Sequence, residues 1–268
     1  MVRAPLPLRP ARRRRRFLST TFALACAALA CSCHADSDPV TLAIGAGMQH
    51  LPSWPGARNH RAETLPYFDV DWPDHLSLSS QDGLQVDLIG GSILHGGVYG
   101  DYQWGRDSED LGVLRHAIDP LSPRLTLGGY LEWQLTRQVD VGSNLAHDIN
   151  GAGSYFKLYG EWDLPALGLL QQSLELDWQA MNAAAMQRFF GVTPSQAGTL
   201  GVMPWRPGAG GQLASLEYDL FVPTGKHTGL ALAFNYGRLL GAAADSPLAT
   251  HFGSTTQLTE SLAFVYHQ

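Results

Sequence analysis

The chain of 268 residues carries 24 acidic and 18 basic residues, and Lys157 and Lys226 are its only lysines. Seven of the basic residues are arginines within residues 1–35, which leaves 11 basic residues and a net charge of −13 in residues 36–268. This balance predicts no nucleic-acid partner, because nucleic-acid binding needs a basic face. The three cysteines also lie within residues 1–35, so residues 36–268 can form neither a disulfide nor a cysteine-ligated metal site.

The first 35 residues have the pattern of an export signal. Five arginines, Arg12 to Arg16, precede an apolar run over residues 17–30, and Cys33-His34-Ala35 fits a small-x-small cleavage site. The run is shorter than the ~20 residues of a membrane-spanning helix. We therefore expect a cleaved signal peptide over 1–35 and export to the cell outer membrane. A twin-arginine signal and a lipoprotein signal processed at Cys31 remain as alternatives.

The rest of the chain alternates apolar and polar side chains. In residues 154–164, Phe156, Leu158 and Trp162 fall on one side, and Lys157 and Glu161 fall on the other, as in a strand with one apolar and one charged face. The same alternation and intervening turn signals predict twelve strands, at 40–47, 66–72, 75–80, 83–89, 97–104, 123–134, 139–146, 154–164, 170–180, 209–221, 227–239 and 255–266.

No segment after the signal has 18 continuous apolar residues, and only a closed barrel pairs all strand edges in lipid. The predicted fold is all-β: a transmembrane antiparallel up-and-down β-barrel over 36–268, with twelve strands, or ten as the alternative. The four longest connections, 48–65, 105–122, 181–208 and 240–254, all fall at one end. Outer-membrane barrels have long outer loops and short periplasmic turns, so these four are expected outside.

The two faces of the predicted strands differ in polarity. Lipid-facing positions are expected to include Phe68, Val70, Trp72, Leu84, Val86, Leu88, Leu216, Tyr218, Leu220, Leu230, Leu232, Phe234, Leu262, Phe264 and Tyr266. The expected lumen acids are Asp69, Asp71, Glu132, Glu161, Asp163, Glu175, Asp177, Glu217 and Asp219, with Asp87 and Asp101, offset by Arg124 and Lys157. Glu260 is the exception, since it falls on the lipid face and is expected near the outer end. An acidic lumen fits either a hydrated polar filling or a cation-preferring channel.

Patterns for catalysis or cofactor binding are weak, and we predict no catalytic residue, cofactor site or metal site. The histidines lack the spacing of a helical zinc site, and His50 and His60 merely share the first long connection. Barrel-embedded lipid hydrolases use a Ser/His pair, for which Ser154, Ser173 and Ser215 are the available serines, but no GxSxG motif occurs.

The longest connection, 181–208, carries two helix signals. Residues 181–188 can form two helical turns, and Thr193-Pro194 is a helix start with proline in the first position. Phe189 and Phe190 lie between the two signals. They are predicted to pack into the mouth of the barrel, and recognition of a ligand by an outer loop is the alternative.

Two motifs resemble the MipA/OmpV family of outer-membrane proteins. Residues 186–192, followed by Ala197, resemble the family pattern N-Q-x-Y-F-G-V…A, and residues 236–248 resemble Y-x-R-L-x-G-D-A-A-D-S-P-I, with Ala242 in place of an aspartate. The motif positions are Gln187, Arg188, Phe189, Phe190, Gly191, Val192, Tyr236, Arg238, Leu239, Gly241, Asp245, Ser246 and Pro247.

The resemblance implies a non-enzymatic scaffold in outer-membrane lipid that holds a murein-degrading lytic transglycosylase near a murein synthase. OmpV-like members instead imply a surface-exposed adhesin or antigen. A small cation-preferring pore, suggested by the acidic lumen, is the third alternative.

Overall fold

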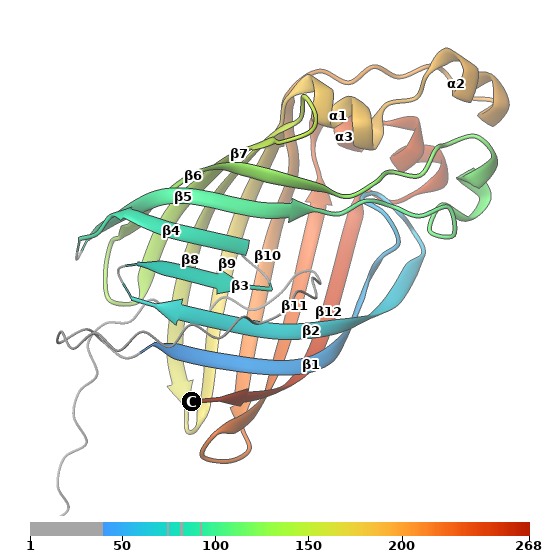
Figure 1. The fold of residues 1–268 in the computed structure, drawn as a ribbon. Coiled ribbons are helices and arrows are strands. Elements are labelled where there is room, and N and C mark those ends of the chain that lie inside the picture. The colour runs from blue at the N-terminus through green and yellow to red at the C-terminus, as the bar shows by residue number, and fades with distance from the viewer. Residues whose placement is uncertain (1–39, 74, 81–82, 92) are drawn as a thin grey trace, which may run out of the picture.

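The computed structural model describes residues 40–268 except 74, 81–82 and 92, so the expected signal peptide lies outside the described residues. The chain forms a closed barrel in which each strand pairs with its sequence neighbours and β1 pairs with β12, all antiparallel (Figure 1). The strands are β1 (Thr41–Pro52), β2 (His60–Trp72), β3 (Leu76–Ser79), β4 (Gly83–Ile89), β5 (Leu94–Gln103), β6 (Arg124–Gln134), β7 (Val139–Asp148), β8 (Ser154–Leu167), β9 (Leu170–Met181), β10 (Gly210–Pro223), β11 (Thr228–Leu239) and β12 (Thr256–His267).

This architecture confirms the predicted fold, and each of the twelve expected strands is present. The first outer connection is the main correction: it was expected over 48–65 but spans only 53–59. The polar residues on either side of it resemble a loop in sequence, yet their alternation continues the strands. Gln49 and Glu63 both point inward and hydrogen bond at 3.1 Å, while the β1–β2 ladder extends to Pro52 and His60.

The two ends of the barrel differ in their connections. One end has the turns 73–75, 90–93, 135–138, 168–169 and 224–227, together with the C-terminus, where the backbone N–H of Gln268 donates to Leu42 at 3.0 Å. The other end has the long connections 104–123, 182–209 and 240–255 and all the helices (Figure 1). Short periplasmic turns and long outer loops are the rule in outer-membrane barrels, so we assign the helical end to the outside. No helix among the described residues is long and apolar enough to span a membrane.

The outer surface of the strands is apolar, as the alternation predicts. Exposed side chains from strands around the barrel include Trp72, Leu84, Leu88, Leu216, Phe234, Leu262, Phe264 and Tyr266. Glu260 is also exposed on this face, four residues from the outer end of β12 and paired in register with His50 and Phe234. It lies two residues from the middle of the strand, so its expected place at the outer membrane interface stays a prediction.

The inward side chains fill much of the lumen. Towards the periplasmic end, a buried cluster joins Ala43, Tyr67, Phe221, Ala231, Ala263 and Val265. Further along, the Tyr159 hydroxyl donates to Glu132 at 2.6 Å, and the Tyr130 hydroxyl donates to Asp87. Tyrosine suits this position because its ring fills space while its hydroxyl satisfies a lumen carboxylate.

Strands β3 and β4 are shorter than their neighbours. Strand β2 pairs with β3 only over residues 69–72, and β5 pairs with β4 only over 96–100. On the outer side, residues 60–67 of β2 and 101–103 of β5 therefore have a strand partner on one side only, and Figure 1 shows β3 and β4 ending well below the cap. We call this region the unpaired stretch of wall.

Replacing Leu262 by Arg should test the lipid face. Leu262 is at the middle of β12, between Met48 and Leu232 in register. A basic residue near the midplane of the bilayer costs about 2–4 kcal/mol, but only about 0–1 kcal/mol near the interface. Leu262→Arg should therefore lower the free energy of unfolding from phosphatidylcholine vesicles by about 2–4 kcal/mol. Glu260→Arg, on the same face of the same strand, should cost much less. Equal costs at the two positions would contradict this placement of the membrane.

Candidate functional site

The outer connections fold together into a cap over one end of the barrel. Side chains from four separate connections share one buried cluster, made of Trp54, Ala57, Leu111, Leu114, Ile118, Val192, Ala197 and Leu248. The first connection also forms a bridge to the last one, between Ala57 and Gly253. The outer connections thus form a packed structure with its own apolar core, not a set of independent loops.

Both helices predicted in the longest connection are present: the second begins at Pro194 as expected, but the first covers residues 183–190 in place of 181–188 and so includes Phe189 and Phe190. Asn182 caps α1 (Ala183–Phe190), since its side chain accepts from the Ala185 N–H at 2.9 Å. Thr193 and Gln196 form a reciprocal capping box on α2 (Pro194–Leu200), with Pro194 in the first turn. These bonds satisfy backbone N–H groups that lack partners inside the helix.

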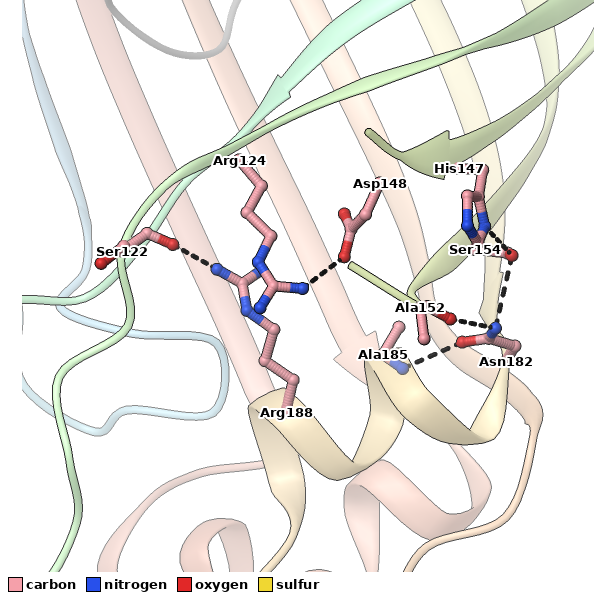
Figure 2. A network of polar contacts seen from close by, with 9 residues as sticks. All are labelled: Ser122, Arg124, His147, Asp148, Ala152, Ser154, Asn182, Ala185 and Arg188. Carbon is pink, nitrogen blue, oxygen red and sulfur yellow. Dashed lines mark hydrogen bonds and ion pairs between the residues drawn. The ribbon is translucent and has the colours of Figure 1, made fainter. Parts of the chain in front are cut away.

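Polar contacts fasten α1 to the barrel wall (Figure 2). The Asn182 amide nitrogen donates to the backbone oxygen of Ala152 at 2.8 Å and to the Ser154 hydroxyl at 3.3 Å. At the other end of the helix, the Arg188 guanidinium donates to the backbone oxygen of Ser122. Asn182 thus couples the start of α1 to the β7–β8 hairpin, and Arg188 couples its end to the start of β6.

Arginine and serine side chains also satisfy the carbonyl groups at the end of α1. Arg106 donates to the Phe189 oxygen at 3.1 Å, and Ser246 donates to the Phe190 oxygen at 2.7 Å. Burial, followed by repulsion from Arg188, lowers the pKa of Arg106 to about 10, while Asp119 opposes the shift. Both donors are buried. Arg106 thereby links the connection 104–123, and Ser246 links the connection 240–255, to the longest connection, 182–209.

Most of the family-motif residues meet inside this cap. Phe189, Phe190, Val192, Leu239, Ser246 and Pro247 are buried there, and Phe189 and Phe190 pack with Met186, Leu239, Ala243 and Ala249. Gly191 ends α1, where an added Cβ would lie 1.9 Å from the Gln187 amide nitrogen, and Gly241 begins α3 (Gly241–Ala244) at φ 46°. Tyr236, Arg238 and Asp245 are exposed and lie outside this packing. The two motifs therefore build one structure from distant parts of the chain.

The structure brings one serine and one histidine together. On the outward face of the β7–β8 hairpin, the Ser154 hydroxyl lies 2.8 Å from His147 Nδ1. The Asn182 oxygen is occupied by the helix cap, and its nitrogen donates to Ser154, while the donor between Ser154 and His147 is set by the His147 tautomer. Among the described contacts, none orients the other nitrogen of His147, as a catalytic triad requires. His147, Ser154 and Asn182 together hold the β7–β8 hairpin against the start of α1.

The lumen acids lie on the inward faces, and basic side chains neutralise some of them. Glu161, Glu175 and Glu217 lie side by side in register on β8, β9 and β10. Lys157 forms ion pairs with Glu175 at 2.6 Å and Asp177 at 3.2 Å, and the Asn235 amide donates to Glu217 at 2.5 Å. Arg124 is paired with the buried Asp148 at 2.7 Å, as Figure 2 shows. Lys157 thus pairs with two of the predicted lumen acids, whereas Arg124 pairs with Asp148, which was not among them.

A cavity of about 390 Å³ lies between the cap and these lumen acids. Its lining comes from the first connection, α1 and ten of the strands, and it combines amide, hydroxyl and aromatic side chains with Arg61, Asp101 and Lys157. Arg61 was expected in a loop, but it points inward, pairs with Glu63 at 2.6 Å and forms an ion pair with Asp110 of the cap. The alternation of Arg61 with Glu63 was the sequence signal for this position. Among the described residues, no group of three or more metal-ligating side chains could hold an ion.

Comparison with known proteins identifies the family. The model of the family described as MltA-interacting protein MipA matches residues 44–268. The chain belongs to the MipA family. A search of curated proteins finds no match. The MipA model spans both motifs and eleven complete strands, so the family pattern describes the barrel and the cap together.

Solved outer-membrane barrels share the general architecture with this MipA-family chain. A bacterial polysaccharide outer membrane secretin is 9% identical, covers 85% of this chain and 98% of its own, and has a TM-score of 0.42. The NanC porin is 5% identical, with coverages of 85% and 99% and a TM-score of 0.35. The outer membrane channel DcaP of Acinetobacter baumannii is 6% identical, with coverages of 86% and 96% and a TM-score of 0.37. At these scores the likeness carries no argument about function.

Replacing Ser246 by Ala should loosen the cap and leave the barrel intact. The Ser246 hydroxyl donates to the Phe190 oxygen and accepts from the Leu248 N–H at 3.2 Å, and its loss leaves both groups buried without this partner. Such a loss costs about 1–3 kcal/mol. Hydrogen exchange of α1 should therefore accelerate about tenfold or more, while β9 and β10 stay protected. Asp245→Ala, at the exposed neighbouring position, should change neither. Equal protection of α1 in the two variants would show that Ser246 does not hold the cap.

Proposed function

We propose that this outer-membrane β-barrel is a non-enzymatic scaffold that holds a murein-degrading enzyme of the MltA type, a lytic transglycosylase, at the periplasmic side of the membrane and near a murein synthase. The observation that carries the proposal is the family match over residues 44–268, since the family is described by its interaction with MltA. In such a role the barrel supplies a fixed position in the membrane, and the binding free energy comes from surfaces that reach the periplasm.

Three consecutive periplasmic turns offer such a surface. The connections 90–93, 135–138 and 168–169 each carry a large exposed apolar side chain, namely Ile93, Leu135 and Leu169. The adjoining strand ends add exposed Ile89 and Leu167. We call these five residues the periplasmic apolar turns. Exposed apolar patches of this kind are typical of protein-protein interfaces.

The remaining periplasmic turns are different. Thr224, Lys226 and His227 in the turn 224–227 are polar or charged, and the turn 73–75 contains Pro73 and His75. The exposed apolar residues within the periplasmic turns therefore lie in one sector, from β4 to β9, while exposed Val40 and Trp72 lie at strand ends outside it. A partner that docks on one sector would leave the others free for a second enzyme.

The test is capture of an MltA-type lytic transglycosylase by the tagged full-length protein, cross-linked in detergent-solubilised outer membranes and measured by mass spectrometry. The double variant Leu135→Gln, Leu169→Gln should reduce capture about tenfold or more, because well-buried interface side chains each contribute more than about 1 kcal/mol. Met203→Gln is the matched control, since it removes an equally exposed apolar side chain at the outer end.

Recovery of only lipid and barrel-assembly proteins with the unmodified chain would overturn the scaffold. Undiminished capture by the double variant would place the docking surface elsewhere on the barrel.

The outer cap supports a second candidate, binding at the cell surface. Val113 and Met203, 81% and 78% exposed, are the most exposed large apolar side chains among the described residues, and both lie on the cap. If the cap is an adhesive surface, deletion of residues 194–203 should abolish adhesion of intact cells and leave barrel assembly unchanged. Unchanged adhesion would contradict this candidate.

A further inference from the structure

We propose that the outer end of β11 carries a binding site for the phosphate headgroup of an anionic membrane lipid. Two family-motif residues, Tyr236 and Arg238, are exposed and take no part in the packing of the cap. Both have the same parity as the lipid-facing Phe234 on this strand. The two motif residues therefore point out of the barrel toward the membrane, where the scaffold function gives them no role.

Arg238 brings an uncompensated positive charge to this face. Within the part of the chain that the structure describes, its guanidinium forms no hydrogen bond, ion pair or ring contact. On the outward faces of the fully described strands β10, β11 and β12, the only acid is Glu260, four residues along from Thr256, the register partner of Arg238. Four residues of a strand span about 13 Å, so Glu260 does not neutralise this charge.

The residues beside Arg238 form a row across four strands. Trp178 on β9 pairs in register with Ala214 on β10, Ala214 pairs with Arg238, and Arg238 pairs with Thr256 on β12. Directly opposed side chains on one face have Cβ atoms about 4.5–5.5 Å apart. The Arg238 guanidinium and the Thr256 hydroxyl can therefore donate to the same phosphate. The small side chain of Ala214 leaves room for it on the other side of the arginine.

The next row toward the middle of the membrane is apolar. It pairs the same four strands in register and consists of side chains that are 40–64% exposed, namely Leu176, Leu216, Tyr236 and Leu258. Tyr236 suits the boundary between the two rows, because its ring is apolar and its hydroxyl is polar. A polar outer row and an apolar inner row fit an amphiphile whose phosphate binds Arg238 and whose acyl chains lie along the leucines.

The level of Arg238 agrees with that of lipid headgroups. Leu232 is the register partner of Leu262, at the middle of β12, and Arg238 is six residues further toward the outer end. At ~3.4 Å per residue and a strand tilt of ~40°, six residues rise about 15 Å. The apolar band of an outer-membrane barrel is about 25 Å tall, so its edge lies about 12 Å from the middle. Arg238 thus lies just outside the hydrocarbon, in the headgroup region.

A lipid headgroup fits this site better than a free anion. A single exposed arginine binds a free anion weakly, because water and salt screen the attraction. The bilayer holds a lipid at this depth, and its chains add contact with the apolar row. Basic side chains at the membrane surface favour anionic lipids over neutral ones. The occupant is therefore a lipid with a net negative phosphate headgroup.

Titration of lipids onto the full-length protein in dodecyl maltoside, measured by native mass spectrometry, tests the proposal. The native chain should bind its first phosphatidylglycerol about tenfold more tightly than its first phosphatidylcholine, which has a phosphate but no net charge. Arg238→Gln should remove most of this preference, because an arginine–phosphate hydrogen bond is charge-assisted and can be bidentate. Thr256→Val, which keeps the shape of the side chain but removes its hydroxyl, should weaken phosphatidylglycerol binding several-fold.

Arg137→Gln is the matched control, since it removes the same charge from an exposed residue in the periplasmic turn 135–138 and should leave the preference unchanged. No preference for phosphatidylglycerol in the native chain, or equal losses in the Arg137→Gln and Arg238→Gln variants, would overturn the proposal. Displacement of phosphatidylglycerol by inorganic phosphate at about 10 mM would also overturn it, because the acyl chains would then contribute nothing to binding.

Discussion

The constraint on which the structure depends is that lipid offers no hydrogen bonds to a polypeptide backbone. Every N–H and C=O group within the hydrocarbon must find a partner inside the protein, and for strands this requires a closed sheet. The pairing of β1 with β12 over residues 43–50 and 260–267 closes it. Closure fixes one face of each strand toward lipid and the other toward the lumen, so the alternation of side chains follows from the same requirement.

Closure also explains why the lumen needs ion pairs and tyrosines. Alternation places carboxylates such as Glu132, Glu175 and Asp177 in an interior that is only partly hydrated, where an uncompensated charge is costly. Lys157 and Tyr159, which occupy the inward positions of β8, lie within bonding distance of these three acids. The inward face of β8 thus compensates acids on its neighbour β9 and on β6, two strands away.

The sequence predicts the barrel well because its information is local. Alternation and turn signals depend on residues close together in the chain, and all twelve strands and the start of α2 could be predicted from them. Prediction was less accurate where polar residues occur at strand ends. Gln49, Arg61 and Glu63 resemble a loop in sequence but point into the lumen, and only cross-strand pairing distinguishes the two cases.

The candidate site was less predictable, because it depends on contacts between distant residues. The packing of the aromatic motif residues at the barrel mouth could be predicted from the sequence. The hydrogen bonds from Ser246 to Phe190, 56 residues away, and from Arg106 to Phe189 could not. Asn144 likewise has no local signal: it is one polar residue on an alternating strand, and only closure of the barrel places it in the same cavity as Trp104.

The two ends of the barrel are built from different physical elements, and this separation bears on function. At the outer end, polar contacts and a shared apolar core hold long connections in one arrangement over a polar cavity. At the periplasmic end, the turns are too short to form a structure of their own, yet three neighbouring turns expose apolar side chains. A short turn on a closed sheet has little freedom to lose, so a side chain such as Leu169 can bind a partner at low entropic cost. The proposed docking surface in the periplasm and the cap with its cavity therefore use separate residues of one barrel wall.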